Sequence, residues 1–115
     1  MADQPDRQQS GASAPEVRRL AALVPYQQGA VVSRTIIKKP AGTVTLFAFD
    51  VGEGLSEHTA PFEALVCVLD GAAEVRIDGA PYRVAAGETI TLPAGHPHAL
   101  KALERFRMML VMVRA

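Results

Sequence analysis

Residues 87–98 read GETITLPAGHPH, a stretch that combines a turn, a short strand and two histidines. Gly87 can adopt the positive φ that a tight turn requires, and the alternating residues after it favour a β-strand. Pro93 lacks the N–H group that a central strand needs, so it predicts the end of this strand. We therefore expect His98 to open the following strand at one rim of a sheet or barrel.

The same β-type pattern extends over most of the chain. From Ala30 onward, short β-branched and apolar runs are separated by glycine, proline or aspartate, a rhythm typical of an antiparallel sandwich or barrel. Asp78-Gly79 predicts a tight hairpin, because its glycine accepts a positive φ. The predicted strands span residues 31–38, 43–51, 63–69, 73–78, 82–85, 88–92, 98–103 and 105–113.

Two of these strands, 63–69 and 105–113, are apolar on both faces. A strand with one face in water should instead alternate apolar and polar residues. A second sheet, the N-terminal segment or a partner subunit must therefore cover the extra apolar face. Because two-fold dimers are the commonest oligomers, we expect a homodimer.

The N-terminal part of the chain predicts a tail and a helix. Residues 1–12 are polar and predict a disordered tail, and residues 13–115 predict one domain with its barrel over about 30–114. Ser13 and Glu16 have the spacing of a capping box. A helix over about 14–24 is predicted by apolar residues at helical spacing, namely Val17, Leu20, Leu23 and Val24.

Composition excludes several classes of function. The 115 residues contain 12 basic and 12 acidic side chains, so the chain has no net charge that would favour a nucleic acid or an anionic membrane. No apolar run is long enough for a transmembrane helix. Cys67 is the only cysteine, which fits a reducing compartment. We expect a cytoplasmic protein that binds neither nucleic acid nor membrane.

Two segments resemble the paired signatures of the cupin superfamily. In the first, Gly52 is followed after five residues by His58, and the segment closes at Gly71; the second is the stretch 87–98. The resemblance covers roughly residues 52–102 and is shared with small, single-domain bacterial cupins of unassigned function. It implies an all-β fold, a double-stranded β-helix or jelly-roll barrel with one short N-terminal helix.

The resemblance also implies a metal site, which this chain carries only in part. Metal-binding cupins hold a divalent cation with three histidines and a glutamate. His58 and His98 match the first and last histidine positions, whereas Ala60 stands at the second histidine position and Ala64 at the glutamate position. The asparagine that ends the second signature is replaced by Ala102.

Glu63 and His96 are the candidates for additional ligands. Glu63 is one residue from the glutamate position, and one step along a strand turns a side chain to the opposite face. His96 shares strand parity with His98, but Pro97 lies between them. Since two imidazoles bind transition metals weakly, we expect either a weakly held Zn, Fe, Mn or Ni ion or no metal.

Strand parity predicts a mostly apolar pocket at the barrel mouth, with Phe47, Phe49 or Phe62 as possible walls. Its inward-facing residues would be His58, Ala60, Ala64, Val66, His98 and Leu100. The alanines would leave room for a small organic ligand.

Three functions are consistent with these features. The first is a small-molecule-binding protein, with or without the weak metal. The second is an enzyme, either a metal-dependent dioxygenase or isomerase or a metal-free acid/base catalyst. The resemblance to metal-free cupins implies that such a catalyst pairs a histidine with an acid and a tyrosine, for which Asp50, Tyr26 and Tyr82 are available. The third is a structural or oligomerisation module. The sequence does not decide whether there is catalysis, because one fold hosts many chemistries.

Overall fold

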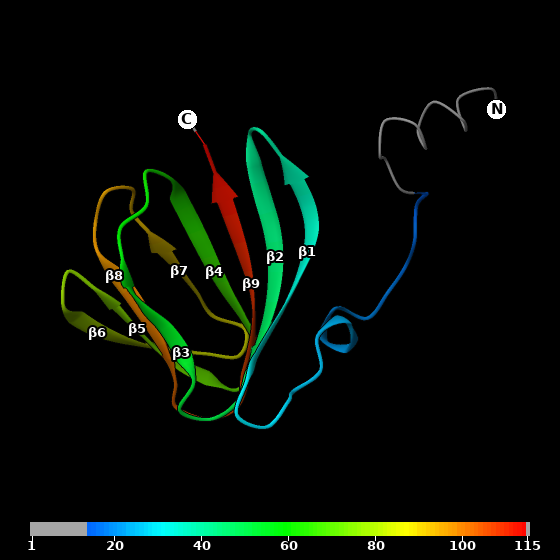
Figure 1. Cartoon of the computed structure of the whole chain (residues 1–115), viewed down its shortest axis with the longest axis horizontal. Helices are drawn as coiled ribbons and strands as arrows, with labels where there is room; N and C mark the ends of the chain where they lie inside the picture. The colour runs from blue at the N-terminus through cyan, green and yellow to red at the C-terminus, as the bar shows by residue number, and fades with distance from the viewer. Residues whose placement is uncertain (1–13, 115) are drawn as a thin grey trace.

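The computed structural model describes residues 14–114, which form two packed antiparallel sheets (Figure 1). The five-stranded sheet has the order β1 (Val31–Lys39), β2 (Gly42–Phe49), β9 (Phe106–Val113), β4 (Glu63–Asp70) and β7 (Thr89–Leu92). The four-stranded sheet has the order β3 (Gly54–His58), β8 (His98–Ala102), β5 (Ala72–Ile77) and β6 (Ala80–Ala85). This architecture confirms the predicted all-β jelly-roll barrel. The predicted tail over 1–12 lies outside the described residues.

Eight of the nine strands coincide, within three residues at each end, with the predicted apolar runs. β3 is the exception, because no strand was predicted there. Its sequence, GLSEH, contains one apolar residue, and four of its five residues are exposed. β3 exists because it pairs with β8, where Gly54 lies opposite Lys101 and Leu55 opposite Leu100.

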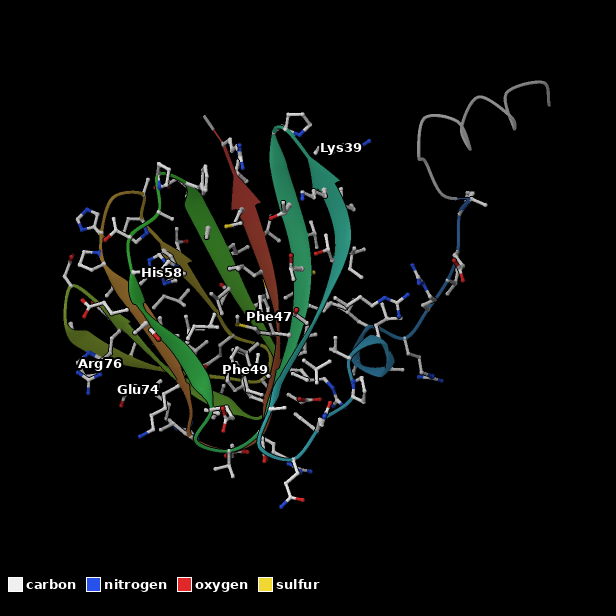
Figure 2. The ribbon with its side chains drawn as sticks, in the orientation of Figure 1. Lys39, Phe47, Phe49, His58, Glu74 and Arg76 are labelled. Carbon is white, nitrogen blue, oxygen red and sulfur yellow. The ribbon has the colours of Figure 1, made fainter. Side chains whose placement is uncertain are left out.

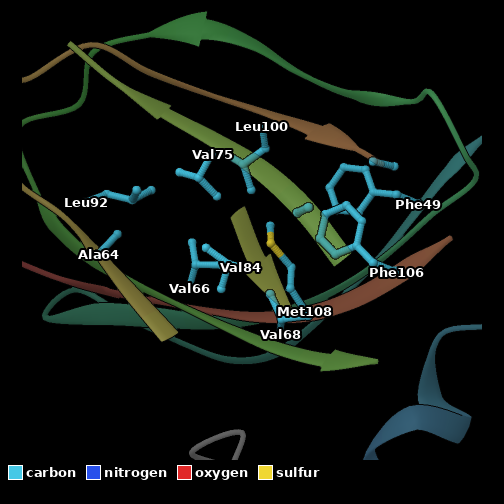
Figure 3. Close-up of a cluster of buried hydrophobic side chains, with 12 residues drawn as sticks. Phe49, Ala64, Val66, Val68, Val75, Val84, Leu92, Leu100, Phe106 and Met108 are labelled. Carbon is cyan, nitrogen blue, oxygen red and sulfur yellow. The ribbon is translucent and has the colours of Figure 1, made fainter. Parts of the chain in front are cut away.

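The main core lies between the inner faces of the two sheets (Figure 3). Phe49 and Phe106 close one end of it, stacked nearly parallel with their ring centroids 4.4 Å apart. Ala64 and Leu92 lie toward the other end. Large rings therefore fill one end of the core, and small and aliphatic side chains fill the other.

The predicted helix over 14–24 is wrong. Only Leu20–Leu23 forms a turn, of the 3₁₀ type (η1), and Arg19 and Val24 on either side of it have extended backbone angles. An isolated helix this short is marginally stable, and Val17 is fully exposed, so it contributes no buried helical face. Val24 is instead fully buried with Leu46 on the outer face of the five-stranded sheet. Ser13, the proposed cap, lies outside the described residues.

A polar cluster fastens this N-terminal segment to the barrel. The Arg107 guanidinium lies 4.0 Å from the Tyr26 ring centroid, donates through Nε to Val24 O at 2.7 Å, and contacts Asp70. The Tyr26 hydroxyl donates to the Asp70 carboxylate. Burial, followed by this hydrogen bond to Asp70, raises the pKa of Tyr26 to about 12. Tyr26 therefore stays protonated and serves as a structural donor.

Two glycines, Gly71 between β4 and β5 and Gly79 between β5 and β6, allow turns of the chain in different ways. At the predicted hairpin, Asp78 and Gly79 both have positive φ, 52° and 80°, as a tight two-residue turn requires. Gly71 also has a positive φ, and a Cβ there would lie 1.9 Å from Arg105 O. Gly71 therefore allows the chain to pass against the start of β9. Within residues 14–114, no helix is long and apolar enough to cross a membrane.

Candidate functional site

His58 and His98 lie directly opposite each other in the β3–β8 pair, and their Nε2 atoms are 3.2 Å apart (Figure 2 labels His58). His58 ends β3 and His98 begins β8, so both rings are at the same rim of the barrel. The rings meet edge to face, with centroids 4.4 Å apart. His58 thus closes a strand in a stretch where no strand was predicted.

The second nitrogen of each ring contacts a backbone carbonyl. Nδ1 of His58 is 2.9 Å from Ser56 O, and Nδ1 of His98 is 3.2 Å from His96 O. Because a carbonyl oxygen can only accept, both Nδ1 atoms must carry hydrogen. In neutral rings, both Nε2 atoms then present lone pairs to each other. A shared proton, a metal ion or a water molecule that donates to both nitrogens would stabilise this arrangement.

The two imidazoles have different surroundings. His98 is buried, with 6% of its surface exposed, whereas His58 is exposed at the rim. Burial lowers the pKa of His98 below its usual value, and the neighbouring His58 lowers it further, against a smaller opposing effect of the bond to His96. Near neutral pH, His98 therefore tends to remain uncharged, the form in which imidazole binds a metal.

A pocket opens beside the histidine pair. Its volume is about 50 Å³, counted as the space open to the centres of water-sized molecules. This is room for a few waters or a small organic molecule. The pocket is lined by Leu55, His58, Ala60, Phe62, Ala64, Leu92, His98, Leu100, Met108, Leu110 and Met112. Apart from the two histidines, all of these side chains are apolar.

The structure brings most of the predicted pocket residues together. Five of the six line the pocket, and Phe62 is one of its walls. Val66 is fully buried in the core and does not reach the pocket, although it faces the same way as Ala64. Phe47 and Phe49 also belong to the core rather than to the pocket wall.

The sequence prediction missed the pocket wall that β9 supplies. Met108, Leu110 and Met112 alternate along this strand and face inward. Their spacing of two residues contained the signal. However, the alternation of residues along a strand could not show that this row of side chains lines the pocket.

Glu63 and His96, the candidate additional ligands, are engaged elsewhere. The Glu63 carboxylate accepts a hydrogen bond from Ala94 N at 2.9 Å, and His96 Nδ1 lies 2.8 Å from an Asp78 carboxylate oxygen. Within residues 14–114, no group of three or more histidine, cysteine, aspartate or glutamate side chains is arranged to hold a metal ion. The structure therefore offers two imidazoles and an apolar wall.

The residues suggested for metal-free acid/base chemistry also lie away from the histidines. Asp50 accepts hydrogen bonds from Gly29 N and Arg105 Nε, and the bond from Arg105 is the largest cause that lowers its pKa to about 2. Tyr26 is bound to Asp70 on the outer face, and Tyr82 is half exposed on β6. None of the three lines the pocket.

Comparison with known families decides what the barrel is. A family model described as "Cupin domain" matches residues 45–114, more than half of the chain. The chain belongs to the cupin family. The match includes both histidines and the β9 wall of the pocket, so the cupin resemblance of the sequence is confirmed.

Solved structures of other proteins resemble this one closely. The conserved protein SPY1581 of unknown function from Streptococcus pyogenes is 41% identical, with a TM-score of 0.85 over 90% of each chain. A cupin 2 conserved barrel domain protein from Leptotrichia buccalis is 43% identical, with a TM-score of 0.80 over 82% of this chain and 46% of its own. A cupin superfamily protein from Desulfitobacterium hafniense is 25% identical, with a TM-score of 0.83 over 88% of this chain and 94% of its own. Among curated proteins, there is no match to this cupin.

Proposed function

We propose that this cupin binds a small organic molecule in its apolar pocket, beside a divalent transition metal held weakly by His58 and His98. The observation that carries the proposal is the 3.2 Å approach of the two Nε2 atoms, with both Nδ1 atoms directed to carbonyls. Metal-binding histidines commonly donate their second N–H to a carbonyl in this way, which fixes the tautomer and the ring orientation.

The two histidines fit a metal ion in separation as well as in orientation. Imidazole nitrogens bind zinc at about 2.0–2.1 Å, so one ion can contact both Nε2 atoms at their present distance. Stable protein sites usually provide three or four ligands, so water or the bound molecule would have to complete the coordination. Weak, exchangeable binding is therefore expected.

The pocket residues define what each part of the site would do. A bound metal would act as a Lewis acid toward an oxygen of the ligand. Ala60 and Ala64 leave space beside the histidines, and Met108, Leu110 and Met112 exclude water from the opposite wall. A ligand with an apolar body and one oxygen-bearing group directed to the histidines matches this arrangement.

Metal binding by matched histidine variants tests the proposal. Untagged protein purified without chelators is titrated with Zn²⁺, Ni²⁺, Mn²⁺ and Fe²⁺ by calorimetry, and its metal content is measured by elemental analysis. We expect one ion per chain for the wild type. Either His58→Ala or His98→Ala should lower the affinity by more than about tenfold, because even the loss of a group that only hydrogen-bonds to a metal ligand costs that much.

His96→Ala is the matched control, since His96 is at the same rim but is bound to Asp78. It should retain wild-type affinity. Equal metal binding by the wild type and the His58→Ala/His98→Ala double variant would refute the metal site. Protein that binds neither metal nor any small apolar molecule would refute the proposed function as a whole.

A further inference from the structure

The inward face of β9 ends in a positive charge at the pocket mouth. Met108, Leu110 and Met112 alternate along the strand and line the pocket. The next residue of the same parity is Arg114, which directly follows β9. Its backbone N–H donates to Ala41 O at 2.8 Å, so the chain is still held beside the barrel at this point.

The Arg114 side chain reaches a wall of the same pocket. Its guanidinium carbon lies 4.6 Å from the centroid of the Phe62 ring, and Phe62 lines the pocket together with His58 and His98. Stacking on an aromatic ring uses the face of a guanidinium and leaves its in-plane N–H groups available. These donors form a planar fork that matches a carboxylate.

Two acidic groups near this rim, Glu63 and Asp78, are already engaged. Glu63, next to Phe62 in sequence, accepts the hydrogen bond from Ala94 N, and Asp78 is paired with His96. An anion that enters the mouth would therefore meet the guanidinium of Arg114 at the outer edge and the apolar side chains below it.

We infer that the pocket selects small organic acids, with Arg114 as the residue that binds the carboxylate at the mouth. This inference rests on the proposed ligand-binding function and names the chemical class of its ligand. The apolar body of the acid would lie against Phe62 and the β9 wall, while the carboxylate pairs with Arg114. Arg114 would thus determine specificity, and the imidazoles and any metal would act on the other end of the molecule.

Matched acid and amide pairs test this inference. The probes are 2-methylpropanoate, 3-methylbutanoate and benzoate, each with its uncharged amide of the same shape. Binding is followed by calorimetry and by NMR of the methyl groups of Met108 and Met112. We expect the wild type to bind at least one acid about tenfold more tightly than its amide, as one partly exposed charge-assisted pair allows.

Arg114→Gln should abolish this preference and leave the affinity for the amide unchanged. Arg114→Lys should retain part of it, because the charge remains without the planar fork. Arg34→Gln is the matched control, since Arg34 is an exposed arginine on β1 away from the pocket lining, and it should keep the full preference. Higher salt should weaken the preference.

Two kinds of result would overturn the inference, and they are distinguishable. If acids and amides bind the wild type equally, or if the preference persists in Arg114→Gln, the inference fails while the ligand-binding function stands. If neither acids nor amides bind the wild type, the assignment of organic acids fails. If the wild type also bound no metal, the proposed function would be refuted as well.

Discussion

His58 and His98 are oriented by the same local device. In each case Nδ1 donates to the carbonyl of the residue two positions earlier, Ser56 or His96. Each hydrogen bond fixes the tautomer of its ring, and the two rings together direct their remaining nitrogens to a common point. A side chain that could not donate to these carbonyls would lose this orientation even if it could bind a metal.

The lowered pKa of His98 gives the stability of the protein a pH dependence. In the unfolded chain, His98 takes up a proton at about pH 6.5. In the folded protein, burial and the neighbouring His58 lower its pKa, so protonation requires a lower pH. His98 therefore contributes stability that is present above this pH and is lost as the pH falls toward the folded pKa.

We expect urea denaturation to give a smaller free energy of unfolding at about pH 5 than at about pH 8. His98→Gln should show a weaker dependence, because glutamine does not titrate, while the exposed His96→Gln should behave like the wild type. NMR titration of the His98 ring should give a pKa below the usual histidine value. A pKa above that value would contradict the expected sign.

At the scale of elements, burial of Val24 helps to attach the N-terminal segment, whose local conformation is largely irregular. Val24 is fully buried with Leu46 and Ala48, whereas Val17 is fully exposed in the same segment. The same valine-to-alanine substitution at these two positions therefore separates the effect of burial on stability from the effect of conformational propensity.

Val24→Ala should destabilise the protein by about 2 kcal/mol, the cost of removing two buried methyl groups and leaving a small cavity. Val17→Ala should change the free energy of unfolding by less than about 0.5 kcal/mol, as is usual for exposed positions. Thermal and chemical denaturation measure both. Equal effects of the two substitutions would mean that Val24 does not hold the segment.

These elements also show where sequence reasoning succeeds and fails. Asp78-Gly79 was predictable because its turn requires backbone angles that few residues adopt, and both have positive φ. The helix over 14–24 was not, since the apolar spacing around Val24 fits a helix but also fits an extended segment with one anchor. β3 was missed because its amino acids carry little strand preference, and only pairing with β8 makes it a strand.

At the scale of the whole molecule, the outer face of the five-stranded sheet remains partly apolar. The N-terminal segment covers its side near Leu46 and Ala48, but Leu65 on β4 and Val113 on β9 are exposed by 36% and 55%. These residues belong to the two strands whose double-sided apolar pattern predicted a homodimer. That homodimer stays a prediction.

We expect light scattering to give about twice the 12.3 kDa mass of one chain. Leu65→Lys should shift the protein toward the monomer, because a charge at the centre of an apolar interface is costly. Leu103→Lys is the matched control, since Leu103 is also exposed but lies in the loop before β9. A wild type with the mass of one chain would contradict the prediction.

The site follows the same pattern of partial predictability. The meeting of His58 and His98 could be predicted from the cupin resemblance, because the glycine, proline and histidine positions of both segments match the two signatures. Val66 could not be separated from Ala64 by parity, since both face inward at different depths. Arg114 carries no motif, and its proximity to Phe62 arises only when β4 and β9 are paired in the sheet.

The place of His58 at the end of an edge strand has a mechanical consequence. β3 is hydrogen-bonded to β8 alone, and His58 and His98 form the last rung of that ladder. A proton, metal ion or ligand that bridges the two rings would therefore also hold the edge strand β3 against β8. Amide hydrogen exchange along Gly54–His58 should then be slower when the site is occupied than when it is empty. This measurement requires no label on the bound ligand.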